Sequence, residues 1–210
     1  MIQPCKICGI SDSKILAFLT SHPTPPKMIG FICNWPKSKR FVEYNKLKEL
    51  LKIDKKKSEY VAVLVNPFQD DILEKIKNLH FDYYQIYDSS PEEIKLIKER
   101  YNKKIITAIT VKNKNDVNKY KEFQSISDII LFDSKGYEQS LNFNHQLLND
   151  IPNTFTKMIA GNIQVDMDFA KLYEKAEIID ISGALESEIG IKDLKKIDIF
   201  LKNIKKYNEK

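Results

Sequence analysis

Apolar and polar residues follow two alternating patterns along the whole chain. Eight short apolar runs, each typical of a β-strand, fall near residues 3–8, 28–33, 60–65, 82–87, 104–111, 128–133, 155–160 and 177–182. Several runs are apolar at consecutive positions, such as Val61-Ala62-Val63-Leu64-Val65, as expected for a parallel sheet that is covered on both faces. Between the runs, apolar residues recur every three or four positions, which predicts amphipathic helices. The pattern therefore indicates eight successive β–α units.

Two of the predicted helices show the helical spacing clearly. Their apolar stripes consist of Ile72, Ile76 and Leu79 in one helix and of Leu194, Ile197, Phe200, Leu201 and Ile204 in the other. Pro91 and Asp193 stand where helix starts are favoured.

Eight β–α units in 210 residues favour a (β/α)₈ TIM barrel of the α/β class, with residues 1–210 forming a single domain. A doubly wound open sheet is the alternative, but no G-x-G-x-x-G follows the first strand. The segment from Ser21 to Lys27 contains three prolines and predicts a loop between the first helix and the second strand.

Charge and composition restrict the partners that this protein would have. The net charge is +5, but lysines alternate with acidic residues over 92–100 and 193–206, as on solvated helix faces. A nucleic-acid footprint would gather basic residues on one surface. No apolar run approaches the roughly 20 residues that span a bilayer, and no signal peptide is evident. We expect a cytoplasmic protein with neither nucleic acid nor membrane as a partner, and either a monomer or a homodimer.

Three cysteines, Cys5, Cys8 and Cys33, are too few and too odd for a disulfide framework. Cys5 and Cys8 have C-x-x-C spacing, but redox pairs of this type normally open a helix, whereas residues 3–10 have the pattern of a strand. Residues three apart on a strand point to opposite faces. A zinc site would need further ligands, and the three histidines are scattered singly. The pattern favours neither role.

Two reactive side chains end predicted strands. Cys8 closes the first strand and Asp133 the sixth, and four of the six glycines (Gly9, Gly136, Gly161 and Gly183) follow predicted strands 1, 6, 7 and 8. Barrel enzymes carry their sites at the carboxyl ends of the strands, where glycine lets the backbone approach a ligand closely. We therefore predict a site at this rim, with the thiol and the carboxylate as an acid–base pair.

The chain contains a series of short motifs, and their order along the sequence is informative. They are Lys6-Ile7-Cys8-Gly9-Ile10, Gly30-Phe31, Lys37 to Val42, Val61 to Asn66, Gln85-Ile86, Asp133, Ala160-Gly161 and Asp180 to Asp193. In this order and over nearly the whole chain, they resemble the phosphoribosylanthranilate isomerase family. The corresponding family patterns include K-I-C-G-I, K-S-P-R-Y-V, Q-L-H-G, A-G-G and D-V-S-S-G-V-E-x-x-P-G-x-K-D.

The resemblance implies a barrel enzyme of tryptophan biosynthesis. Without metal or organic cofactor, it would catalyse the Amadori rearrangement of a small phosphosugar, N-(5-phosphoribosyl)anthranilate. Asp133 would be the general acid on the ribose ring oxygen and Cys8 the base that removes the C2′ proton. Cys8 would need a lowered pKa. Lys6 is close in sequence but, two residues earlier on the strand, need not reach the surroundings of the sulfur.

The resemblance also implies substrate contacts. Arg40, one of only two arginines, would bind the anthranilate carboxylate, and Gln85 is a further predicted contact. The phosphate would rest on backbone N–H groups around Gly161, Asn162, Ser182, Gly183 and Ala184. A short helix starting near Glu186 would add its positive end, while Lys192-Asp193 would cap the last helix.

Four departures from the family patterns leave alternatives open. The sixth loop, 134–140, has one glycine where the family has G-G-x-G. Tyr87 replaces the histidine of Q-L-H-G, Asn162 replaces the second glycine of A-G-G, and Ser182-Gly183-Ala184 replaces S-S-G. The alternatives are a related phosphosugar isomerase with a shifted substrate and a non-catalytic homologue that binds phosphate. Trp35, Tyr83 and Tyr84 are predicted to pack rather than to bind substrate.

Overall fold

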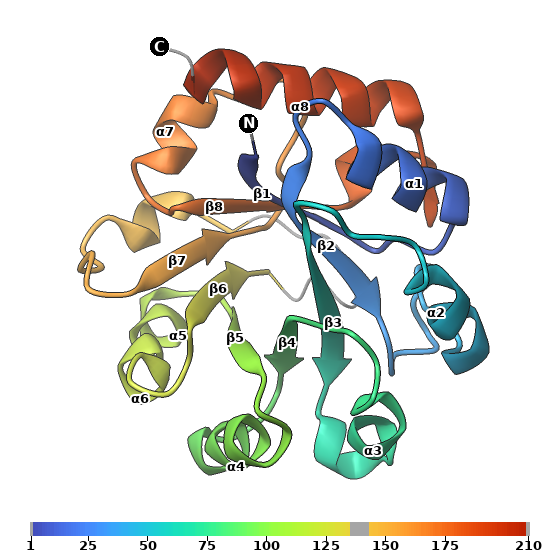
Figure 1. Ribbon diagram of the computed structural model, residues 1–210. Helices are drawn as coiled ribbons and strands as arrows, with labels where there is room; N and C mark the ends of the chain where they lie inside the picture. Colours follow the sequence, from blue (N-terminus) through green and yellow to red (C-terminus); the bar gives the residue numbers. More distant parts are fainter. Residues whose placement is uncertain (1, 135–142, 209–210) are drawn as a thin grey trace.

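The computed structural model describes residues 2–134 and 143–208 and contains a closed barrel of eight parallel strands (Figure 1). The strands are β1 (Gln3–Cys8), β2 (Pro26–Ile32), β3 (Glu59–Val65), β4 (Tyr83–Tyr87), β5 (Lys104–Thr110), β6 (Ile129–Asp133), β7 (Thr156–Ile159) and β8 (Ile178–Ile181). Because β1 pairs with both β2 and β8, the sheet has no open edge. The predicted TIM barrel is confirmed and the doubly wound alternative is wrong. Both ends of each predicted strand lie within two residues of the ends of the corresponding observed strand.

Helices surround the barrel, and α8 lies beside α1 and α7 to complete the ring (Figure 1). They are α1 (Ser13–Ser21), α2 (Tyr44–Leu50), α3 (Ile72–Ile76), α4 (Pro91–Tyr101), α5 (Lys114–Asn118), α6 (Tyr120–Phe123), α7 (Phe169–Tyr173) and α8 (Leu194–Asn208). Three short 3₁₀ turns are η1 (Pro67–Gln69), η2 (His145–Leu148) and η3 (Gly183–Leu185). Several of these helices span only one or two turns, which explains how eight units fit a short chain. No helix in the described ranges is long and apolar enough to cross a membrane.

Local sequence signals determine where the helices start. Ser90 caps α4 through a capping box with Glu93, and Pro91 occupies the first turn. Asp193 Oδ1 accepts hydrogen bonds from the backbone N–H groups of Lys195 and Lys196, so Asp193 caps α8 as predicted. The buried stripe of α8 consists of Ile197, Phe200, Leu201 and Ile204. Leu194, predicted to belong to it, is 43% exposed because it lies in the first turn.

Strand alternation divides the core into two layers. On β1, Cys5 and Ile7 pack against the helices, whereas Lys6 and Cys8 face the barrel interior. The side chains of Cys5 and Cys8 therefore lie in different layers, as the strand pattern predicted. On β4, Tyr84 packs toward the helices and Tyr83 toward the interior, and both are buried. The interior parity places Cys8, Tyr87, Asp133 and Asp180 at one end of the barrel.

The connection after β8 differs from its prediction. No helix starts at Glu186; instead, β9 (Glu186–Glu188) and β10 (Ile191–Lys192) form a small antiparallel hairpin. The η3 turn ends at Leu185, and the backbone of Glu186, which follows it, is extended, with φ −108° and ψ 142°. Gly190, with φ +90°, then reverses the chain direction. This hairpin brings Glu186 and Lys192 to the carboxyl-terminal rim.

Candidate active site

A pocket of about 270 Å³ lies at the carboxyl ends of the strands. Its lining includes the predicted acid–base pair together with Arg40, Tyr87, Asp180 and the two loops 160–164 and 181–184. Cys8 comes from β1 and Asp133 from β6, strands that are not neighbours in the barrel. The thiol and the carboxylate therefore enter one pocket from separate parts of its wall.

A glycine on β2 makes room for the first of these groups. Gly30 is the register partner of Cys8. A Cβ at Gly30 would lie 3.0 Å from Cys8 Sγ and 3.2 Å from Lys6 Nζ. The absence of a side chain at this position lets the thiol and the ammonium share the interior of the barrel.

Lys6 lies close to Cys8, a contact that its place in the sequence did not require. Residues i and i+2 of a strand share a face, so both side chains point into the barrel. Lys6 Nζ donates a 2.8 Å hydrogen bond to Oδ2 of Asp180, its register partner on β8, and both groups are buried. Burial alone would lower the pKa of Lys6, but the Asp180 carboxylate raises it above its ordinary value. Lys6 therefore keeps its charge beside the thiol.

The environment of Cys8 opposes ionisation in the ligand-free protein. Burial raises the pKa of the Cys8 thiol, the Lys6 ammonium acts against that rise, and the Asp180 carboxylate adds to it. The net direction is upward, so the ligand-free protein does not have the lowered pKa that the role of Cys8 as a base would need. At neutral pH the group is a thiol.

Tyr87 contacts Asp133, the other member of the predicted acid–base pair. Its hydroxyl donates to Asp133 Oδ2 at 2.8 Å, and the backbone N–H of Ser134 donates to Oδ1 at 2.7 Å. Burial and then the Asp133 charge raise the pKa of Tyr87 well above 10, which keeps the hydroxyl protonated as a donor. Sequence reasoning assigned Tyr87 no role, although its place at the end of β4 and its substitution for the family's histidine were the available signals.

Gln85 differs from its predicted role. It is 1% exposed, is not part of the pocket lining, and donates from Nε2 to the Tyr87 hydroxyl at 3.3 Å. Gln85 precedes Tyr87 by two residues on β4, so it lies one layer deeper in the barrel. The structure thus places Gln85 behind Tyr87, outside the pocket lining.

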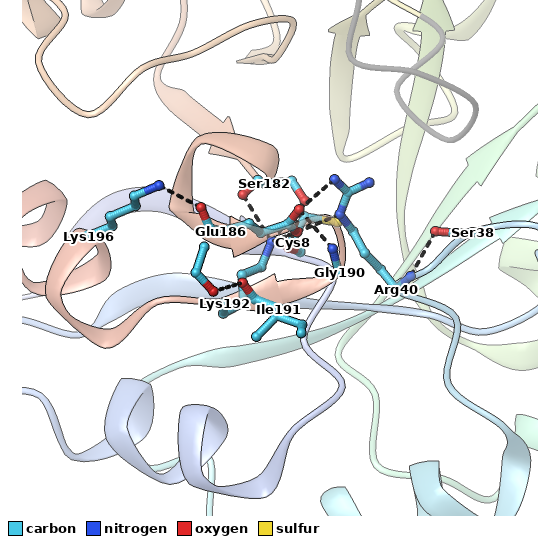
Figure 2. Close-up of polar contacts among 10 residues, drawn as sticks. Cys8, Ser38, Arg40, Ser182, Glu186, Gly190, Ile191, Lys192 and Lys196 are labelled. Atoms are coloured by element: carbon cyan, nitrogen blue, oxygen red, sulfur yellow. Dashed lines mark hydrogen bonds and ion pairs between the residues drawn. The ribbon is translucent and has the colours of Figure 1, made fainter.

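Arg40 is fixed by a residue that the sequence analysis did not identify as functional (Figure 2). Arg40 Nε donates to Glu186 Oε1 at 2.6 Å and Nη2 donates to Oε2 at 2.9 Å. Lys192 Nζ also donates to Glu186 Oε1, at 2.7 Å. Lys192 is therefore a buried partner of Glu186 rather than a helix cap. The hairpin that replaces the predicted helix explains why both residues were missed.

The seventh and eighth loops bring their predicted residues to the pocket. Gly161, Asn162, Ser182, Gly183 and Ala184 all line it. Gly161 (φ +87°) and Asn162 (φ +50°) have left-handed backbones, as the tolerance of asparagine for this conformation allows. Ser182 Oγ donates to the backbone oxygen of Cys8 at 3.0 Å, which joins the eighth loop to β1. Gly136 and the rest of the sixth loop from residue 135 onward lie outside the described residues.

Comparison with known proteins shows which family this chain resembles along most of its length. The family model described as N-(5'phosphoribosyl)anthranilate (PRA) isomerase matches residues 5–203. An N-(5'-phosphoribosyl)anthranilate isomerase of Rhizobium rhizogenes is 31% identical over 205 residues, covering 93% of this chain and 90% of the relative. The one from Campylobacter jejuni is 32% identical over 209 residues, covering 96% and 98%. A crystal structure of phosphoribosyl anthranilate isomerase with reduced 1-(o-carboxyphenylamino)-1-deoxyribulose 5-phosphate shares the fold, with a TM-score of 0.80, 22% identity, and coverage of 98% of this chain and 100% of the other.

Proposed function

The chain belongs to the N-(5'-phosphoribosyl)anthranilate isomerase family, and from that premise we propose how its pocket residues divide the chemistry. The protein is an isomerase of tryptophan biosynthesis that converts N-(5-phosphoribosyl)anthranilate to the carboxyphenylamino-deoxyribulose phosphate by an Amadori rearrangement. The observation that carries the division of roles is that Cys8 and Asp133 line one pocket from non-adjacent strands. A sugar bound between them can be protonated on one side and deprotonated on the other.

Asp133 acts first in this scheme. It gives a proton to the ribose ring oxygen as the anthranilate nitrogen lone pair expels that oxygen from C1′, which leaves an open-chain protonated imine. Cys8 then removes the proton from C2′, and the C–H electron pair forms the C1′–C2′ double bond of an enolamine. Tautomerisation of the enolamine gives the ketose. Each acid–base contribution of this kind is worth about 10²–10⁴ in rate.

The basic form of Cys8 is the thiolate. Because burial favours the thiol, catalysis depends on the Lys6 ammonium, which stabilises the thiolate next to it. Tyr87 supports the acid, since its hydroxyl directs Asp133 Oδ2. Lys6 thus supports Cys8 as the base, and Tyr87 supports Asp133 as the acid.

The two anionic ends of the substrate require separate contacts. Arg40 binds the anthranilate carboxylate through its planar guanidinium. Backbone N–H groups of Gly161, Asn162, Ser182, Gly183 and Ala184 bind the phosphate. Asp180 lines the same pocket, and its buried Oδ1 has no hydrogen-bond partner among the described residues.

The partner in this proposal is a small phosphosugar rather than a nucleic acid or a membrane, and the protein acts in the cytoplasm as a monomer or a homodimer. The mixed charge along the helices supports the proposal that nucleic acid is not a partner. Three buried cysteines without disulfides fit a reducing compartment.

The fluorescence decay of phosphoribosylanthranilate, generated in situ, tests the roles of Cys8 and Asp133. We expect Cys8→Ser and Asp133→Asn each to lower kcat by about 10²-fold or more, because each removes one proton-transfer group. Cys5→Ala is the matched control, since it removes a buried thiol from the helix-facing side of the same strand. Turnover near the wild-type rate in either site variant contradicts the assignment. No turnover by a folded wild type would favour the non-catalytic homologue.

A further inference from the structure

Glu186 lies at the centre of a cluster of donors from two parts of the chain, the loop after β2 and the β9–β10 hairpin itself (Figure 2). Oε1 accepts from Arg40 Nε at 2.6 Å and from Lys192 Nζ at 2.7 Å. Oε2 accepts from Arg40 Nη2 at 2.9 Å and from the backbone N–H of Gly190 at 3.0 Å. The Glu186 side chain is only 4% exposed. A buried carboxylate with four donors has one orientation, and so has the guanidinium that it holds.

The two hydrogen bonds between Arg40 and Glu186 use one edge of the guanidinium and leave another edge available for a ligand. A guanidinium has five N–H donors, and two of them, one on Nε and one on Nη2, point to Glu186. Nη1 makes no hydrogen bond within residues 2–134 and 143–208, and Arg40 lines the pocket. The edge formed by Nη1 and Nη2 can therefore pair with a second carboxylate in the bidentate geometry that arginine favours.

The charges of the cluster favour an anion. The charges of Arg40 and Glu186 alone would cancel. Burial lowers the pKa of Lys192, whereas the Glu186 carboxylate acts against that fall, and with Lys192 protonated the three side chains sum to +1. Burial raises the pKa of Glu186, but the hydrogen bonds from Arg40 and the Lys192 ammonium outweigh it and bring the pKa to about 2. The carboxylate is therefore ionised at any pH at which the enzyme would work. Lys192 keeps the cluster attractive to an anion although Glu186 faces Arg40.

The same cluster reaches the other parts of the site. Lys192 Nζ also donates to the backbone oxygen and to Oγ of Ser182, at 3.0 and 3.1 Å. Ser182 Oγ in turn donates to the backbone oxygen of Cys8. One chain of hydrogen bonds therefore connects Arg40, the eighth loop and the strand that carries the base.

We propose that Glu186 is a positioning residue that acts through Arg40 and sets the affinity for the carboxylate of the substrate. The inference rests on the proposed function of Arg40 as the carboxylate contact. Glu186 itself does not touch the substrate. Its effect should therefore be seen only with ligands that carry the carboxylate.

Two ligands that differ by one group test this inference. One is the product analogue, reduced 1-(o-carboxyphenylamino)-1-deoxyribulose 5-phosphate. The other is the corresponding phenylamino compound, which lacks the carboxyl group and is called the anilino ligand below. Calorimetry gives the Kd of each variant for both ligands. The preference for the carboxylate is the ratio of the Kd for the anilino ligand to the Kd for the carboxylated ligand. Glu186→Gln raises the net charge of the cluster to +2 but removes the carboxylate that orients the guanidinium of Arg40. We expect the loss of orientation to outweigh the added charge and to reduce the preference by about 10-fold to 100-fold, the range for a lost charge-assisted contact, with little change for the anilino ligand. Lys196→Met is the matched control, because Lys196 Nζ contacts only the backbone oxygen of Glu186.

Arg40→Met separates failure of this inference from failure of the proposed function. If Arg40→Met keeps the preference, Arg40 does not bind the carboxylate and the proposed contact is wrong. If Arg40→Met abolishes the preference while Glu186→Gln keeps it, only the positioning inference is wrong. The double variant should lose no more than Arg40→Met alone. Unchanged binding of the anilino ligand shows in each case that the barrel is folded.

Discussion

At the scale of single residues, Tyr87 distinguishes this site from the motif that it resembles. The family pattern has a histidine where this chain has Tyr87, yet the hydroxyl donates a 2.8 Å hydrogen bond to the proposed acid. Tyr87 also accepts a hydrogen bond from Gln85, so one chain of donors runs from inside the barrel to Asp133. The phenol therefore provides the directional donor that an imidazole N–H could provide.

Tyr87→Phe keeps the ring and removes the donor. We expect kcat to fall by about 10-fold, the order of one lost hydrogen bond to a charged group. Without the donor, the carboxylate form of Asp133 is destabilised relative to the acid form, so the pKa of Asp133 rises. Because the Cys8 thiol has the higher pKa of the pair, Asp133 sets the acidic limb of kcat/KM, and this limb should move to higher pH. The pH–rate profile is the measurement that checks this.

Two variants make the result specific to the Asp133 contact. Tyr83→Phe removes a hydroxyl from the other end of the same strand and should change neither kcat nor the limb. Tyr87→His should recover part of the loss. A fall in kcat without any movement of the limb would indicate a packing role for Tyr87 and contradict the positioning of Asp133.

At the scale of elements, three loops of the barrel meet around the segment that carries Arg40. Gly9, just after β1, has φ +79°, and a Cβ there would lie 2.6 Å from Arg40 Cδ. Gly190, at the turn of the β9–β10 hairpin, has φ +90°, and its Cβ would lie 2.7 Å from the backbone oxygen of Lys39. Both glycines permit close approach, so the position of Arg40 depends on the first and eighth loops as well as on its own.

Gly9→Ala should therefore act on the site through Arg40. The new methyl group has to displace the arginine side chain, and we expect kcat/KM to fall by about 10²-fold, as small misplacements of binding groups can cause. Asn102→Ala is the strain control, since Asn102 also has a left-handed backbone (φ +48°) but ends α4 away from the pocket. It should lose comparable stability in a urea titration while kcat/KM stays unchanged. Equal activity of the two variants would contradict the dependence on Arg40.

The elements also show how much of this molecule could be predicted from its sequence. Hydrophobic patterning predicts all eight strands, because each must be covered on both faces, and strand ends predict Cys8 and Asp133 at the rim. The hairpin at Glu186 was missed because its conformation depends on Gly190 and on long-range contacts with Lys39 and Arg40. The contact between Lys6 and Cys8 follows from strand parity but also requires Gly30 on the neighbouring strand. Pairings between loops distant in sequence leave no periodic signal.

At the scale of the whole molecule, the three cysteines are buried thiols in different layers of one core. Cys5 and Cys33 pack between the sheet and the helices, whereas Cys8 faces the barrel interior. Burial raises the pKa of all three above its ordinary value. The native state therefore retains three protons that an unfolded chain releases at moderately alkaline pH.

This difference predicts a loss of stability on the alkaline side. Above the unfolded thiol pKa of about 8.5, the unfolded state binds fewer protons than the native state, so the free energy of unfolding falls as pH rises. Each thiol contributes about 1.4 kcal/mol per pH unit in that range. Urea midpoints measured between pH 7.5 and 9.5 should fall accordingly, below the range in which exposed lysines and tyrosines titrate. A Cys5→Ala, Cys33→Ala double variant should start less stable but show about one third of the wild-type slope. Parallel slopes for the two proteins would show that other groups cause the alkaline unfolding, because only the thiol count differs between them.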